Sequence, residues 1–90
     1  MPEIRTLLAL STAHVSGDTA RMLNNTTPEK WPVSGGSTSY GWFIYAHDDC
    51  YDEMPLDLVE TFIFARKNGC EYIMFDCDVE PITELPTHDW

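Results

Sequence analysis

Apolar residues gather in three short runs that predict β-strands. The first run, residues 4–10, is rich in leucine and does not alternate, which indicates a central strand or one covered on both faces. The second, residues 40–46, holds Trp, Phe, Ile and Tyr, which are strong strand formers. The third, residues 70–77, follows the longer of two predicted helices. These three runs predict the framework of a small sheet.

The longer helix is predicted at residues 55–68. Pro55 fits a first helical turn, and Gly69 supplies a left-handed stop. Acids near its start and bases near its end suit the helix dipole. Helical spacing gives an expected buried stripe of Leu56, Val59, Phe62 and Ile63. Phe64 falls outside this stripe, so we expect it to be available to a partner.

A shorter helix is predicted at residues 17–24. Ser16 is a good N-cap, and Asp18 suits the positive end of the dipole. Val15 and Ala20 have the spacing of a hydrophobic staple across the cap. The local signals therefore define where this helix begins.

In chain order these elements predict an α+β domain with a small three- to four-stranded sheet and two helices, in the order β-α-(β)-β-α-β. The bracketed strand belongs to a small hairpin that turns at Gly35 and Gly36, inside the polar loop of residues 25–39. The helix before the last strand favours a parallel, right-handed β-α-β crossover. The long loop leaves the direction of the middle strand open, and residues 78–90 predict an irregular acidic tail.

Length and composition indicate one globular domain, residues 1–90. The chain is 43% hydrophobic and 22% charged, which is ordinary for a folded domain. Its 15 acids and 5 bases give a net charge of −10. This excess excludes nucleic acid and anionic membranes as direct ligands and favours a basic partner. No run is long enough to span a membrane, and no signal peptide is recognisable.

The three cysteines indicate a reducing compartment. An odd number does not suit a disulfide framework. Cys70 and Cys77 are seven residues apart, so on one strand they lie on opposite faces. We expect Cys50, Cys70 and Cys77 to be free thiols and the protein to be cytoplasmic.

The net charge is confined to the second half of the chain. Residues 1–47 hold three acids and three bases, whereas residues 48–90 hold twelve acids and two bases. One cluster consists of Asp48, Asp49, Asp52 and Glu53, and Asp57 and Glu60 extend it along the outer face of the longer helix. The other consists of Asp76, Asp78, Glu80 and Glu84.

A parallel crossover would bring both clusters to one edge of the sheet, because the carboxyl ends of parallel strands share that edge. The rim would then carry about nine carboxylates. Ten charges correspond to ~17 Å of duplex DNA, or about five base pairs. Such a rim resembles a short piece of nucleic-acid backbone and fits a groove built for DNA or RNA. The alternative is that the acids only keep the domain soluble.

Candidate chemical sites are few. Asp76 and Asp78 form a D-x-D pair of the kind that holds Mg²⁺ through its carboxylate oxygens. The alternative is that they are two repelling carboxylates on a solvated edge of the sheet. Ser11 and His14 lie near each other in sequence, but no nucleophile elbow or oxyanion device accompanies them. His14 is more typical of a turn or packing residue. We therefore expect no enzyme, no metal and no cofactor.

Surplus aromatic residues suggest a second kind of surface. The strand at residues 40–46 places Trp42 and Ile44 on one face, and Phe43 and Tyr45 on the other. Two helices on one side of the sheet would leave the other face apolar, which marks a partner surface or a self-interface. Helices on opposite faces, or coverage by the segments around Trp31 and Trp90, would remove that surface.

The run from Thr6 to His14, together with Gly41 to Tyr45, resembles small uncharacterised domains carried on phages, plasmids and other mobile elements. In size and acidity the chain also resembles anti-CRISPR proteins, several of which mimic DNA. These resemblances carry no catalytic motif and transfer no functional residue. They imply a mobile-element accessory protein that faces a host defence system.

The sequence thus predicts a non-covalent inhibitor of a host nucleic-acid-binding defence protein with a basic groove, such as a CRISPR effector complex. The expected contact residues are Asp48, Asp49, Asp52, Glu53, Asp57, Glu60, Phe64, Asp76, Asp78 and Glu80. The alternative is a small non-enzymatic structural or regulatory module, including a homodimer, with no role against host defence.

Overall fold

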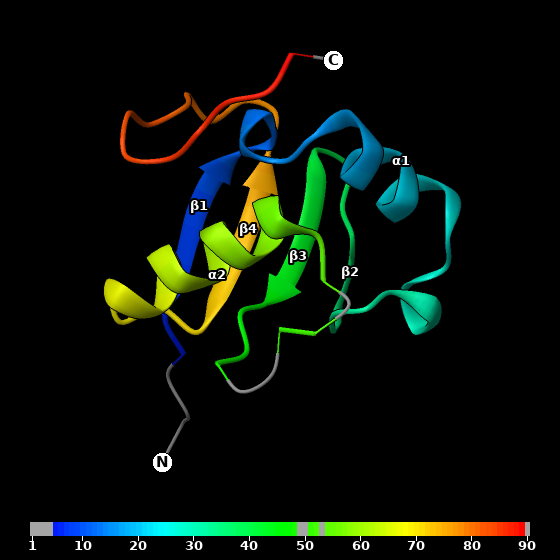
Figure 1. Ribbon diagram of the computed structural model, residues 1–90, viewed down its shortest axis with the longest axis horizontal. Helices are drawn as coiled ribbons and strands as arrows, with labels where there is room; N and C mark the ends of the chain where they lie inside the picture. The colour runs from blue at the N-terminus through cyan, green and yellow to red at the C-terminus, as the bar shows by residue number, and fades with distance from the viewer. Residues whose placement is uncertain (1–4, 49–50, 53, 90) are drawn as a thin grey trace.

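A four-stranded mixed sheet with two helices forms the domain in the computed structural model, which describes residues 5–48, 51–52 and 54–89. The strand order is β1-β4-β3-β2 (Figure 1). The strands are β1 (Leu7–Ser11), β2 (Gly35–Ser37), β3 (Gly41–Tyr45) and β4 (Tyr72–Asp76). The helices are α1 (Gly17–Asn25) and α2 (Leu56–Lys67), with single 3₁₀ turns at Thr12–His14 and Pro28–Lys30. The predicted α+β class and order of elements are confirmed.

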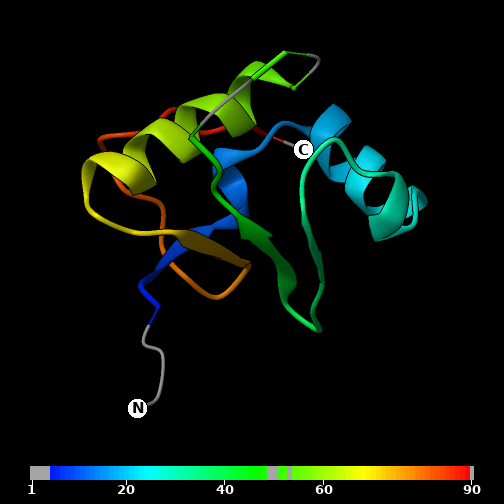
Figure 2. The same ribbon diagram turned by 90° about the horizontal axis from the view of Figure 1, so that it is seen from below.

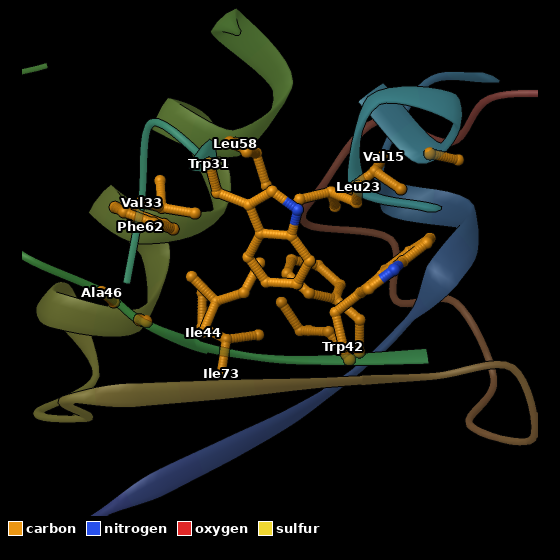
Figure 3. Close-up of a cluster of buried hydrophobic side chains, with 14 of the residues drawn as sticks. Val15, Leu23, Trp31, Val33, Trp42, Ile44, Ala46, Leu58, Phe62 and Ile73 are labelled. Atoms are coloured by element: carbon orange, nitrogen blue, oxygen red, sulfur yellow. The ribbon is translucent and has the colours of Figure 1, made fainter. Parts of the chain in front are cut away.

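Both helices lie on the same side of the sheet (Figure 2). Trp42 and Ile44 of β3, and Ile73 and Phe75 of β4, are buried beneath them. Trp31, from the loop after α1, reaches over the same layer and is also buried (Figure 3). The hydrophobic core therefore lies between one face of the sheet and the helices.

Local signals locate the helix ends correctly. The side chain of Ser16 accepts a hydrogen bond from Thr19 N–H and caps α1, as predicted. Gly69 follows α2 with a φ of 76°, in the left-handed region that glycine tolerates. These two ends depend only on neighbouring residues, which is why the sequence defines them.

The predicted parallel crossover is wrong, because β3 and β4 are antiparallel neighbours. Trp42 lies opposite Phe75, and Tyr45 lies opposite Tyr72. After α2, the turn at Gly69 leads the chain into β4, which runs against β3 (Figure 1). The parallel pair in this sheet is instead β1 with β4.

The buried stripe of α2 is rotated from the predicted one. The buried residues are Leu58, Thr61, Phe62 and Ala65. Leu56 and Ile63 are 72% and 53% exposed, so their predicted burial is wrong. Thr61 can be buried because its hydroxyl donates to the Leu58 carbonyl oxygen at 2.8 Å.

The Gly35–Gly36 pair lies in a strand and not in the hairpin turn that was predicted. Gly35 pairs with Ile44, and Gly36 pairs with Phe43. A β-carbon on Gly35 would overlap the Phe43 carbonyl oxygen, so the close approach of β2 to β3 requires glycine.

Candidate functional site

The two acidic clusters do not meet at one edge of the sheet. Because β3 and β4 are antiparallel, the carboxyl end of β3 lies beside Tyr72, and the carboxyl end of β4 lies beside Gly41. Residues that follow β3 and residues that follow β4 therefore leave the sheet at opposite ends. The single rim of about nine carboxylates, expected from a parallel crossover, is not formed.

One basic side chain, Arg66, lies beside the described part of the cluster that follows β3. The Asp48 carboxylate lies 3.8 Å from an Arg66 guanidinium nitrogen. Arg66 also donates to the Ala46 carbonyl oxygen and to the Tyr45 hydroxyl. Asp52 is exposed, and Asp49 and Glu53 lie outside the described residues. Arg66 thus compensates part of the charge at this end.

Asp57 holds the two helices together and does not lie on an outer face. Its carboxylate accepts hydrogen bonds from Ser16 N–H at 2.7 Å and from the Thr19 hydroxyl at 2.9 Å. Both partners belong to the amino-terminal end of α1. Glu60, one turn later, is half-buried, and Phe64 is partly buried against the core. The expected extension of the acidic surface along α2 is therefore wrong for Asp57.

The second cluster forms what we call the acidic edge, where β1 and β4 end and the tail runs along them (Figure 1). It consists of the four acids predicted for that cluster, Asp76, Asp78, Glu80 and Glu84, and of Asp89, which was not part of the prediction and follows His88 in the tail. Asp76 is half-buried and the other four are exposed. The sequence has no Lys or Arg after Lys67. Across the described ranges, no Lys or Arg forms an ion pair with any of the five.

His14 fixes the tail to the body of the domain. The imidazole is buried, its Nε2 accepts from Ile82 N–H at 3.1 Å, and its Nδ1 donates to the Pro86 carbonyl oxygen at 2.8 Å. His88 N–H also donates to the Ala13 carbonyl oxygen at 2.8 Å. The packing role expected for His14 is confirmed, and through it the acidic edge has a defined shape.

We predict that His14→Leu releases the tail. Leucine fills much of the same space but leaves Ile82 N–H and the Pro86 carbonyl oxygen without their partner, which costs ~1–3 kcal/mol. Hydrogen exchange in residues 79–89 should then be faster in the variant than in the parent, whereas exchange in the β3–β4 pair should not change. Equal exchange rates in the tail of the variant and the parent would contradict this role for His14.

The predicted D-x-D pair does come together with a thiol. Ligand atoms of Asp76, Cys77 and Asp78 lie within 4.8 Å of one another, and Asp76 Oδ1 also accepts a hydrogen bond from Asp78 N–H at 2.8 Å. Cys70 and Cys77 are free thiols, as predicted, and Cys50 lies outside the described residues. The hydrogen bond from Asp78 N–H to Asp76 is the local contact that brings the two carboxylates of this turn together.

The sheet face opposite the helices carries aromatic side chains, and we call it the open face. The Phe43 and Tyr72 rings stack with centroids 5.2 Å apart. Tyr45 lies 5.4 Å from Tyr72, and the Arg66 guanidinium lies over the Tyr45 ring at 5.4 Å. A shallow hollow of about 440 Å³ is lined by Arg5, Ser34, Gly35, Phe43, Tyr45 and Tyr72.

Sequence reasoning found this face only in part. Phe43 and Tyr45 were placed on a face that one-sided helices would leave uncovered, and the helices are one-sided (Figure 2). Tyr72 and Met74 were missed, although both are half-buried on this face while Ile73 and Phe75 are buried on the other. The alternation within residues 72–76 was the signal that would have found them.

Comparisons with known proteins give one match. A family model described as "Family of unknown function (DUF5983) C-terminal domain" matches residues 7–90. Neither the curated proteins nor the solved structures give a significant match. Among the described residues, no helix has the length and apolar character needed to cross a membrane.

Proposed function

Because the chain belongs to the DUF5983 C-terminal domain family, whose function is unknown, we propose a function from its own surface: a non-enzymatic domain that binds a basic protein surface through the acidic edge. The partner is a nucleic-acid-binding protein, and the domain competes with nucleic acid for its groove. As the sequence predicts, we propose that this partner belongs to a host defence system.

The observation that carries this proposal is the uncompensated charge of the acidic edge. Elsewhere in the described parts of the chain, three acids pair with bases: Asp18 with Arg21, Glu71 with Arg5, and Asp48 with Arg66. The five carboxylates of the acidic edge have no such partners within the described residues. A surface rich in Lys and Arg would supply them and would be attracted from a distance.

The size of the edge defines how much nucleic acid it can replace. Five charges correspond to ~8.5 Å of duplex axis, or two to three base pairs, which is half of what the sequence predicted. An exposed ion pair contributes ~0.2–1 kcal/mol, so we expect the five acids to act together and no single one to dominate.

Two charge-matched variants test the proposal. The edge variant carries Asp76→Asn, Asp78→Asn, Glu80→Gln and Glu84→Gln. The control carries Asp48→Asn, Asp49→Asn, Asp52→Asn and Glu53→Gln. Each changes the net charge from −10 to −6 by removing four negative charges. Only the position of the lost charge differs between them.

The tagged parent and both variants are used to capture proteins from nuclease-treated lysate of the host cells. We expect the parent and the control to retain nucleic-acid-binding proteins and to release them as salt rises. The edge variant should lose them, with affinity for the identified partner lowered about tenfold or more, which is about 1.4 kcal/mol. Equal retention by the two variants would contradict a site at the acidic edge.

A further inference from the structure

The open face begins where the acidic edge ends, because Asp76 belongs to both. Asp76 points to the same side of β4 as Tyr72 and Met74, since alternate residues of a strand share a face. We propose that the open face anchors apolar side chains of the same basic partner, in an extended segment whose Lys or Arg reaches Asp76. This inference rests on the proposed function. It adds apolar contacts on the open face to the charged contacts of the acidic edge.

The strand register arranges the open face in three rows. They are Leu7, Tyr72 and Tyr45; Ala9, Met74 and Phe43; and Ser11, Asp76 and Gly41. Aromatic and aliphatic side chains thus fill two rows, and the third row offers one carboxylate. Tyr72 and Asp76 are four residues apart, or ~13 Å along the strand. A bound segment needs its cation about that far from an aromatic or aliphatic anchor.

The side chains of the first two rows offer the kind of surface that binds apolar groups. Leu7 is 43% exposed, and Phe43, Tyr45, Tyr72 and Met74 are half-buried. The stacked pair of Phe43 and Tyr72 forms one wall of the 440 Å³ hollow. Faces of such rings bind aromatic side chains and cations. Neither α1 nor α2 covers this face (Figure 2).

The charges around the open face favour a basic segment over a second copy of the chain. At the Tyr45 and Tyr72 end, Arg5 contacts Glu71 at 2.7 Å and Arg66 contacts Asp48 at 3.8 Å, so these ions balance. At the other end Asp76 has no basic partner among the described residues. A second copy would bring a domain of net charge −10 against this one, whereas a segment with Lys and Arg complements the Asp76 carboxylate.

Selection from a displayed library of random 12-residue peptides tests this inference with a defined probe. The best peptides are measured by calorimetry against the parent and three variants. The face variant carries Phe43→Thr and Tyr72→Thr, which keep strand propensity. The matched control carries Leu56→Gln and Ile63→Gln, which remove two exposed apolar residues from α2. The edge variant is the one defined above, and thermal unfolding checks that every variant folds.

We expect selected peptides to combine an aromatic or aliphatic residue with Lys or Arg. Their affinity should fall about tenfold or more in the face variant, as for truncated hot-spot residues, and stay unchanged in the matched control. When the peptide binds the parent, the backbone amide chemical shifts of β3 and β4 should change.

Other outcomes separate this inference from the proposed function. Basic peptides that lose affinity only in the edge variant would overturn the anchor and leave the proposed function standing. Selected peptides without Lys or Arg, or no selected peptides, would contradict both. A parent dimer that the face variant abolishes would show that a second copy covers the open face, which overturns the inference.

Discussion

Replacing Phe62 by alanine is expected to lower the free energy of unfolding by ~3–5 kcal/mol. The Phe62 side chain is fully buried in the core. Its ring forms T-shaped pairs with the His47 and Tyr51 rings, with centroids 5.2 and 6.4 Å apart, so its loss also removes packing from the segment after β3. A domain of this size has a free energy of unfolding of ~5–15 kcal/mol in total, so this loss is a large share of its stability. Urea unfolding followed by circular dichroism measures the change.

The adjacent residue provides the control. Ile63 is 53% exposed, so we expect Ile63→Ala to cost less than about 1 kcal/mol. If the two variants unfolded at the same urea concentration, the observed rotation of α2 would be wrong.

Replacing Asp57 by alanine is expected to cost ~2–4 kcal/mol, although the residue is charged and half-buried. The carboxylate accepts from Ser16 N–H and the Thr19 hydroxyl, so its loss removes two charge-assisted bonds between α1 and α2. We expect a lower thermal midpoint and faster hydrogen exchange in α1.

Glu60→Ala is the comparison for Asp57, because it removes a half-buried acid from the next turn of α2. We expect it to change stability by less than about 0.5 kcal/mol. A matching loss of stability in both variants would show that Asp57 acts through general charge and not through its two hydrogen bonds.

The elements that could be predicted are those specified by neighbouring residues. Ser16 caps α1, and Gly69 ends α2, where the sequence placed them. The direction of β3 relative to β4 could not be predicted, because their pairing joins residues far apart in sequence, such as Trp42 and Phe75. The rotation of α2 also depends on tertiary packing, since Thr61 is buried only with its hydroxyl bonded to the backbone.

In the candidate site, too, features set by neighbouring residues could be predicted, and features set by tertiary packing could not. The grouping of Asp76, Asp78 and Glu80 was predictable because the three lie within five residues of chain. Their separation from Asp48 was not, because it follows from the antiparallel pairing. The open face required knowledge that both helices cover one side, and a strand with apolar residues on both faces does not reveal that.

Competition with nucleic acid tests the central proposal most directly. A fluorescently labelled duplex is bound to the captured partner, and its anisotropy is followed as the domain is added. We predict that the parent and the Asp48, Asp49, Asp52 and Glu53 control displace the duplex, and that displacement weakens steeply as salt rises. The edge variant should need about tenfold more protein. Displacement by the edge variant at the same concentration as the parent would contradict a binding site at the acidic edge.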